Sequence, residues 1–332
     1  MRLLLKSLRV LFTEGPLGLL GRIWLRLRAP LRRWEFISRR IGIHEWKRRE
    51  RQILARGGPD AYREWGETRH RLYARWGPFP CPRRDRRRLG ALKGVHRGER
   101  IFIMGNGPSL NETPLEKLAG EHTFGLNRVY LLFDRISWKP TFLTLSDWFI
   151  GPDCADELNS LEGMTLFFPE RFRGLLRDGP DVYWYWIKRH VSWEGKPVEE
   201  RFAYDIARGV TPMWSVTNIA IQIAFYMGFD PIYLIGCDCN YKVLDTVKQS
   251  GPDRYGDGVL DNLESTRDDD PNHFDPRYFG RGYRWHNPAV PRMMAGFANC
   301  REGVEAAGGH IYNATVGGKL EVFERVDFDS LF

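Results

Sequence analysis

Cysteine is scarce in this chain, which has five among 332 residues and no repeating spacing between them. Such a set excludes a small disulfide-framed secreted module and makes a reducing cytoplasm the simplest compartment. Cys237 and Cys239 alternate along the end of an expected strand, so their side chains point to opposite faces and cannot jointly bind a metal ion.

An uninterrupted apolar segment is missing from the first 60 residues. Because Lys6 and Arg9 interrupt the leucine-rich start, no window of about 18 uncharged apolar residues exists to span a membrane. No signal-peptide core or small-residue cleavage site is clear. Leucine, isoleucine and Trp24 instead recur at helical spacing among arginines, after a hinge near Gly15 and Pro16. This pattern predicts two short amphipathic helices.

Acidic residues are few in the first 100 positions, where nine Asp and Glu accompany 27 Lys and Arg. We therefore predict that residues 1–60 bind an anionic membrane surface, which makes the protein cytoplasmic and peripheral on the inner face of the cell membrane. The alternative is a helical arm packed on the body, and nucleic acid is not an expected partner. Residues 77–90, "GPFPCPRRDRRRLG", are predicted to be a solvated linker.

Strand and helix patterns alternate in the rest of the chain. Segments such as "IFIMG" and "IYLIGCD" are typical of buried parallel strands, whereas "SVTNIAIQIAFYMGF" has apolar residues at helical spacing and ends at Gly228. We expect a basic helical region at 1–90 and an α/β domain at 91–332, with a doubly wound, mostly parallel, Rossmann-like sheet. Residues 178–208 are expected to form a lid or insertion, and residues 289–307 a helix.

Polar residues follow four of the expected strands. They are Asn106, Asn127, Asp147 and Asp238. Because ligands in doubly wound sheets bind at the carboxyl ends of the strands, these side chains predict one ligand-binding edge.

The first of these strand ends is the turn "GNGPSL", which begins at Gly105. It lacks the lysine of a Walker A loop and the full Rossmann fingerprint, so two interpretations stay open. Gly105 and Gly107 either expose amide groups to a phosphate or simply connect a strand to a helix. Asn106 adds an amide that could reach a phosphate or sugar, and Ser109 could cap the helix that follows. If the turn binds a phosphate, we expect all four residues, Gly105, Asn106, Gly107 and Ser109, to contact the nucleotide.

A family resemblance rests on three segments in order: "MGNGPSL", "FGLNRVY" and "SVTNIAIQIAFYMGFDPIYLIGCD". With the endings "HFDPRYFGRGYRWHNP" and "IYNATVGGKLEVFERVD", they resemble the MptE-like (6-hydroxymethylpterin diphosphokinase-like) domains of bacterial surface-polysaccharide clusters. They are more distantly similar to the bacterial family 42 sialyltransferases, which use CMP-sialic acid. The resemblance covers about residues 95–332.

The resemblance to the sialyltransferases implies a set of donor-binding residues. The glycine turn and the asparagine of the second strand imply nucleotide contacts at Asn106 and Asn127. The start of the later helix implies contacts at Ser215 and Thr217, and the residue after the "LIG" strand implies one at Asp238.

The same resemblance implies catalytic residues. Tyr241 corresponds to a tyrosine that assists the leaving phosphate, and His273 to the catalytic histidine, with His286 as a competing position. A histidine that titrates near neutral pH is suited to remove the proton of an acceptor hydroxyl. Three arginines and four aromatic residues around these histidines could bind a phosphate or stack on a ring, although the aromatics could equally be core. They are Arg277, Arg281, Arg284, Tyr278, Phe279, Tyr283 and Trp285.

Asp147 departs from the asparagine that the sialyltransferases tend to carry at this strand end. Together, Asp147 and Asp238 could hold Mg²⁺ between diphosphate oxygens, which favours a diphosphokinase or a metal-using transferase. The alternative role of Asp147 is a turn or capping residue.

Three functions follow from these observations. The preferred one is a nucleotide-dependent transferase, a glycosyltransferase that uses a CMP-sugar-like donor and a glycan or lipid-linked acceptor in cell-surface polysaccharide or glycolipid synthesis. The alternative is a pyrophosphokinase that transfers diphosphate from ATP to 6-hydroxymethylpterin. The third is a membrane-docked nucleotide-binding scaffold without catalysis.

Overall fold

The computed structural model describes residues 82–188, 200–251 and 260–332, and residues 52, 53, 55, 56, 60, 61 and 64. The membrane-binding segment that we expect at residues 1–60 therefore falls almost wholly outside the described residues and stays a prediction. Among the helices within these ranges, none is long and apolar enough to cross a membrane.

The described part of the chain is built on an eight-stranded parallel sheet in the order β11-β10-β6-β1-β2-β3-β4-β5. From β1 the chain proceeds outward to β5 and then returns to β6 on the other side of β1. The strand order therefore reverses between β1 and β6, the position at which open α/β sheets bind ligands. The doubly wound, Rossmann-like fold predicted from the sequence is confirmed. The strands are β1 (Ile101–Met104), β2 (Thr123–Leu126), β3 (Phe142–Thr144), β4 (Thr165–Pro169), β5 (Val182–Tyr185), β6 (Ile232–Ile235), β10 (Ile311–Asn313) and β11 (Glu324–Arg325).

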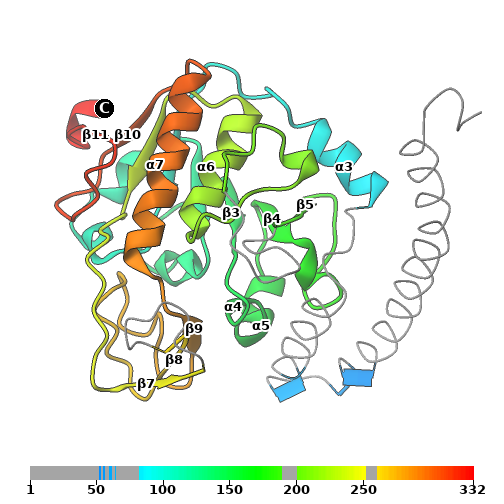
Figure 1. Ribbon diagram of the computed structural model, residues 1–332, viewed down its shortest axis with the longest axis vertical. Helices are drawn as coiled ribbons and strands as arrows, with labels where there is room; N and C mark the ends of the chain where they lie inside the picture. The colour runs from blue at the N-terminus through cyan, green and yellow to red at the C-terminus, as the bar shows by residue number, and fades with distance from the viewer. Residues whose placement is uncertain are drawn as a thin grey trace, which may run out of the picture.

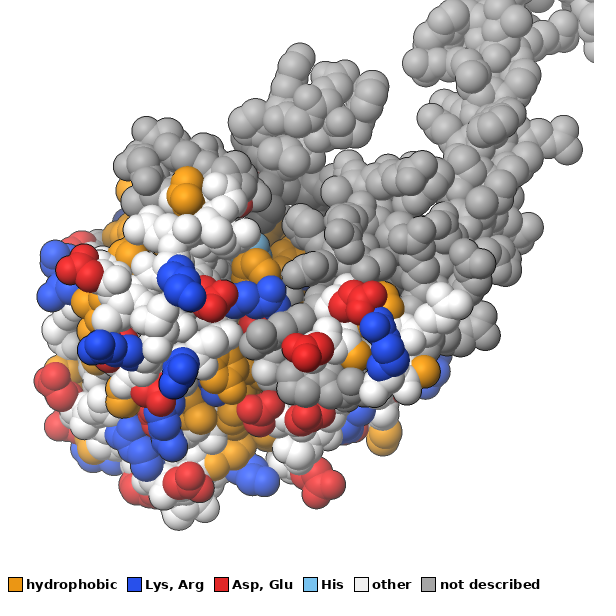
Figure 2. All heavy atoms as spheres, turned by 90° about the horizontal axis from the view of Figure 1, so that it is seen from below, with side chains coloured by type: hydrophobic (Ala, Val, Ile, Leu, Met, Phe, Trp, Pro, Cys, Tyr) orange, Lys and Arg blue, Asp and Glu red, His pale blue; other side chains and the backbone are white. Residues whose placement is uncertain are grey.

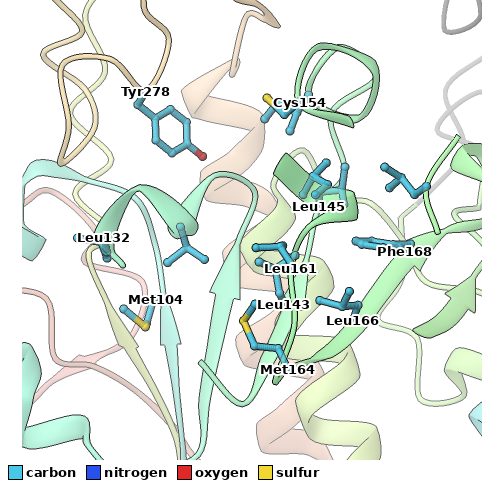
Figure 3. Close-up of a cluster of buried hydrophobic side chains, with 14 of the residues drawn as sticks. Met104, Leu132, Leu143, Leu145, Cys154, Leu161, Met164, Leu166, Phe168 and Tyr278 are labelled. Carbon is cyan, nitrogen blue, oxygen red and sulfur yellow. The ribbon is translucent and has the colours of Figure 1, made fainter. Parts of the chain in front are cut away.

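Each face of the sheet has its own core, because side chains alternate along every strand. Phe102 and Met104 enter one core, which short helices cover, whereas Ile101 and Ile103 enter the other, beneath α6 (Val216–Met227) and α7 (Val290–Ala306). Figure 3 shows part of the first core, where Met104 lies among leucines from neighbouring elements. The short helices on that face are α4 (Ile150–Asp153), α5 (Ala155–Asn159), η1 (Pro108–Asn111), η2 (Leu115–Leu118), η3 (Val129–Leu132), η4 (Glu170–Phe172) and η6 (Asp329–Leu331), whereas η5 (Ile206–Arg208) packs into the other core.

One sequence prediction about the β5 side of the sheet is wrong, and a second is wrong in part. The arginine-rich segment forms helix α3 (Arg83–Gly90), which packs against β5 and η5 rather than acting as a solvated linker. Arg88 donates hydrogen bonds to the carbonyls of Pro180 and Val182, at 2.6 and 2.8 Å, which fixes the helix to the sheet edge. Residues 182–185 form edge strand β5, so this part of the expected lid belongs to the sheet.

A second sheet, antiparallel and three-stranded in the described residues, lies beyond the carboxyl ends of the parallel strands (Figure 1). It consists of β7 (Val247–Ser250), β8 (Asn262–Ser265) and β9 (Arg284–His286), in that order. It carries His286 on β9, and the connection from β8 to β9 carries His273. Both predicted catalytic histidines are thereby delivered to the edge where the polar strand ends lie.

Candidate active site

The glycine turn after β1 is shaped by close contact with β6. The amides of Gly105 and Gly107 donate to the carbonyls of Ile235 and Gly236, at 2.7 and 2.9 Å. A Cβ at Gly107 would lie 1.7 Å from Asp238 Oδ2, so a side chain cannot fit. Both glycine amides are therefore engaged by β6, and the phosphate cradle predicted at these two residues is not formed by their N–H groups.

Asp238 anchors the helical turn η1 that follows. Ser109 donates to its carboxylate from Oγ at 2.7 Å and from the backbone N–H at 3.3 Å. Burial raises the pKa of Asp238, and the Ser109 hydrogen bonds oppose that rise. The cap that we expected from Ser109 is thus supplied by Asp238, and the two predicted donor contacts bind each other.

Asn106 is the residue of the turn with unused bonding capacity. Its Nδ2 donates to Leu126 O at 3.1 Å, and its backbone carbonyl accepts from the N–H of Phe274 at 2.9 Å. Its Oδ1 is buried and has no hydrogen-bond partner among the described residues. Because a carbonyl oxygen accepts only, it suits a hydroxyl or amino group and not a phosphate oxygen.

Asn127 lies in the left-handed region at the end of β2, with φ of 48°. Its Oδ1 accepts from the N–H of Ser146 at 3.4 Å, and its side chain also bonds the hydroxyl of Tyr278. Tyr278 is fully buried, and burial raises its pKa. Asn127 therefore joins the ends of β2 and β3 to the loop that carries His273.

His273 is held beside the glycine turn. Its Nδ1 is 2.7 Å from Asp270 Oδ2, and its ring stacks on Tyr278 with centroids 3.9 Å apart. The next residue, Phe274, donates to the carbonyl of Asn106, so the histidine and the turn are neighbours. The sequence analysis did not single out Asp270, although its spacing of three residues before His273 is a usable signal.

His286 forms a second carboxylate–imidazole pair, with Asp147. The Nδ1 of His286 is 3.0 Å from Asp147 Oδ2, and the same oxygen accepts the backbone N–H of His286 at 3.2 Å. Burial alone would raise the pKa of Asp147, but the His286 imidazole and the hydrogen bonds hold it below its usual value. Phe149 stacks on the His286 ring at 4.6 Å and donates its N–H to Asp147 Oδ1 at 2.7 Å.

Tyr241 lies near both pairs. Its hydroxyl accepts a hydrogen bond from Trp285 Nε1. Burial raises its pKa, and the carboxylates of Asp270 and Asp147 act in the same direction. The hydroxyl therefore stays protonated at neutral pH and can serve as a hydrogen-bond donor.

The amino end of α6 lies at the same edge. Ser215 Oγ accepts from the N–H of Thr217 at 3.1 Å and so caps the helix. The Thr217 hydroxyl bonds the thiol of Cys237, whose Sγ would lie 2.9 Å from a Cβ at Gly105. Ser215 and Thr217 are thus close to the reversal between β1 and β6, and the donor contacts that the resemblance implied for them stay a prediction.

The structure does not bring Asp147 and Asp238 together. They follow β3 and β6, between which β1 and β2 lie, so three strand spacings of roughly 4.8 Å separate them. Each carboxylate is also occupied, by His286 and by Ser109 respectively. The predicted Mg²⁺ site between these two residues is therefore wrong, and the residues present do not fit an ion at this position.

The surrounding arginines and aromatics are mainly structural. Arg277 is paired with Asp275, and Arg284 with Asp153, at 2.7 and 2.8 Å. Tyr278, Phe279 and Trp285 are each less than 10% exposed, so the core interpretation holds for them. Figure 2 views this side of the molecule and shows hydrophobic side chains exposed between clusters of charged ones.

Backbone strain gathers around this edge. Within the described ranges, the non-glycine residues with positive φ follow β2 or β6, or precede α6 or α7. They are Asn127, Met213, Trp214, Cys239 and Ala289. Such conformations cost roughly 1–3 kcal/mol each and often mark functional sites.

Comparison with known proteins identifies no family for this chain. No family model matches the chain, and no curated protein matches it. A solved structure titled as the MAf glycosyltransferase from Magnetospirillum magneticum AMB-1 is similar, with 16% identity and a TM-score of 0.41. The match covers 79% of this chain and 42% of that one, so the chain spans less than half of that protein. The resemblance to MptE-like domains and sialyltransferases stays a prediction.

Proposed function

We propose that this protein is a nucleotide-dependent transferase, a glycosyltransferase that uses a nucleotide-sugar donor of the CMP-sugar type. The observation that carries the proposal is the buried, unpartnered Oδ1 of Asn106 at the reversal between β1 and β6. Leaving such an acceptor unpaired costs about 1–3 kcal/mol, which a ligand hydroxyl or amino group would recover on binding.

The donor nucleotide would lie across the β1–β6 reversal. Asn106 Oδ1 would accept from a ribose hydroxyl or from an exocyclic amine such as that of cytosine. The phosphate would lie toward the capped end of α6, where the helix dipole favours negative charge. This arrangement assigns Asn106 to the nucleoside and α6 to the phosphate, and leaves Gly105 and Gly107 with a packing role.

The two histidines would then have different roles. His273 lies beside the turn that follows β1, whereas His286 is bound to Asp147 after β3, two strand spacings or roughly 10 Å further along the edge. His286 is thus on the acceptor side and would act as the base. Its Nε2 would take the acceptor hydroxyl proton while that oxygen bonds the sugar carbon, and the sugar–phosphate bond would break with its electron pair left on the nucleotide.

His273 and Tyr241 would assist departure of the nucleotide. A protonated His273, held through Nδ1 by Asp270, would donate from Nε2 to the leaving phosphate, and the protonated hydroxyl of Tyr241 is a second donor nearby. Asp147 and Asp270 would act as positioning residues that fix the tautomer and orientation of their histidines.

Binding of nucleotides to the full-length protein tests the proposal. Calorimetry with CMP, UDP, ADP and ATP should show one preferred nucleotide, and Asn106→Ala should weaken its binding by about 5–150-fold. Asn299→Ala is the matched control, because its amide also donates to a backbone carbonyl but lies on α7, distant from the edge. If no nucleotide binds, or if Asn106→Ala binds as tightly as wild type, the proposal fails.

Activity assays distinguish the glycosyltransferase from the other two candidate functions, the pyrophosphokinase and the non-catalytic scaffold. Conversion of ATP to AMP in the presence of 6-hydroxymethylpterin would favour the pyrophosphokinase. The Mg²⁺ site that supported this function in the sequence analysis is not formed, because Asp147 and Asp238 are far apart. His286→Ala should keep nucleotide binding and lose sugar transfer. Full complementation by this variant in cells would instead favour the scaffold.

A further inference from the structure

A cluster of two histidines and one glutamate lies at the opposite edge of the sheet from the candidate active site. His96 and Glu99 precede β1, and His122 precedes β2, so all three lie at the amino ends of the strands. One ligand atom from each lies within 4.8 Å of the others. Strands of four residues place this cluster roughly 13 Å from the other edge, so the cluster is independent of the transferase site.

The three side chains converge on one oxygen. His96 Nδ1 is 2.7 Å and His122 Nε2 is 2.9 Å from Glu99 Oε2. In this arrangement each imidazole needs a proton on the nitrogen that faces the carboxylate. A divalent cation would replace both protons. In a tetrahedral site with metal–ligand bonds of about 2.1 Å, neighbouring ligand atoms lie about 3.4 Å apart, so each imidazole nitrogen would need to move only a short distance away from the carboxylate oxygen.

The backbone holds these residues in place. The amide of His96 donates to Met227 O at 2.8 Å, and the carbonyl of Glu99 accepts from Asp230 at 2.9 Å, which ties the loop to the end of α6. The carbonyl of His122 accepts from Phe102 at 2.9 Å, within the sheet. The ligands would therefore be largely prepositioned, which lowers the entropic cost of binding an ion.

The aromatic residues around the cluster favour a bound cation over a solvated surface ion pair. The His96 ring stacks on Phe229 at 4.4 Å, and Phe142 lies against both imidazoles at 5.7 and 6.3 Å, so the cluster has an apolar floor.

We propose that His96, Glu99 and His122 form a binding site for a divalent transition-metal ion, with Zn²⁺ as the best match. Two imidazole nitrogens, one carboxylate oxygen and no thiolate are a donor set that suits Zn²⁺ rather than Ca²⁺ or Mg²⁺. Three protein ligands leave a fourth position for water. By joining the loop before β1 to the start of β2, the ion stabilises the amino edge of the sheet.

Metal titration of tag-free, chelator-treated full-length protein tests this site. We expect one Zn²⁺ per chain by calorimetry, a tetrahedral absorption spectrum with Co²⁺, and a higher Tm with Zn²⁺. His122→Ala and Glu99→Gln should each weaken Zn²⁺ binding at least roughly tenfold, since loss of even an outer-shell partner costs 10–100-fold.

The matched control is His310→Ala, which removes another exposed histidine at the same edge, paired with Asp230 at 3.1 Å. It should bind Zn²⁺ as wild type does. Glu99→Gln keeps a hydrogen-bond acceptor but loses the charge, so a purely structural hydrogen-bond cluster would tolerate it. The proposal is overturned if wild type binds no Zn²⁺, or if His122→Ala binds it with unchanged affinity; unfolding curves recorded without metal exclude misfolding as the cause.

Discussion

Gly107 tests whether the turn after β1 is dictated by packing against β6. In Gly107→Ala the new Cβ would lie 1.7 Å from Asp238 Oδ2 and 2.8 Å from Gly236 O. The backbone of Gly107, with φ of −68° and ψ of 160°, suits alanine, so the cost arises from the two close contacts, chiefly from the displaced carboxylate and to a smaller extent from the Gly236 carbonyl.

The magnitude follows from what Asp238 would lose. It accepts two hydrogen bonds from Ser109, and bonds to charged groups contribute about 1.5–3 kcal/mol each. Alanine regains about 0.4–1 kcal/mol by restricting the unfolded chain. We expect a net loss of about 2–5.5 kcal/mol, which for a domain of this size lowers Tm by roughly 4–11 °C.

Thermal unfolding of four proteins gives the assay: wild type, Gly107→Ala, Asp238→Ala and the double variant. Because the clash is with the Asp238 side chain, the two substitutions should be non-additive, with the double variant more stable than the sum of the singles by at least about 1 kcal/mol. Gly90→Ala is the control, since a Cβ there meets nothing within 4 Å. Additive effects, or a Gly107→Ala variant as stable as wild type, would refute the packing argument.

Two further predictions concern titrating groups near the same edge. The pKa of Asp147 is lowered in the folded state, so its stabilising contribution is present above its unfolded pKa and is lost as pH falls through the folded value. The stability difference between wild type and Asp147→Asn should therefore shrink as urea unfolding is measured from pH 6 down to pH 3, and a constant difference would contradict this. Burial, followed by the Asp238 carboxylate, raises the pKa of Cys239 to about 12, so iodoacetamide at pH 8 should modify it about three orders of magnitude more slowly in the folded than in the unfolded protein. Peptide mapping measures both rates, and equal rates would exclude the raised pKa.

The sequence was informative where structure is local. The alternation of apolar runs predicted the parallel sheet, and the helical pattern ending at Gly228 predicted α6, because periodicity reports the buried face directly. The arginine-rich segment at 83–90 was misjudged as a linker. Its partners include the carbonyl of Val182, 94 positions away, and no local pattern reports such a contact.

The site was only partly predictable for the same reason. All four polar residues at the strand ends were identified from the sequence. Which of their side chains lie close together depends on the order of the strands in the sheet, and the sequence pattern does not predict that order. The return of β6 beside β1 separates Asp238 from Asp147, and the partner of Asp147 is His286, 139 positions later. The sequence therefore identified the polar residues, but the predicted Mg²⁺ site paired Asp147 with Asp238, which are not neighbours in the structure.

The small antiparallel sheet explains why that later partner arrives in a defined orientation. Along β9, Arg284 and His286 point to one face and contact Asp153 and Asp147, whereas Trp285 points to the other face and bonds Tyr241. The Asp153 side chain of the Arg284–Asp153 ion pair is only 1% exposed, so this pair fixes β9, whereas the His286 side chain is 29% exposed. A three-residue strand thus positions the proposed base through side-chain alternation together with one buried ion pair. The precision of the proposed transfer site depends on β9 being clamped at Asp153, a residue that need not touch either substrate.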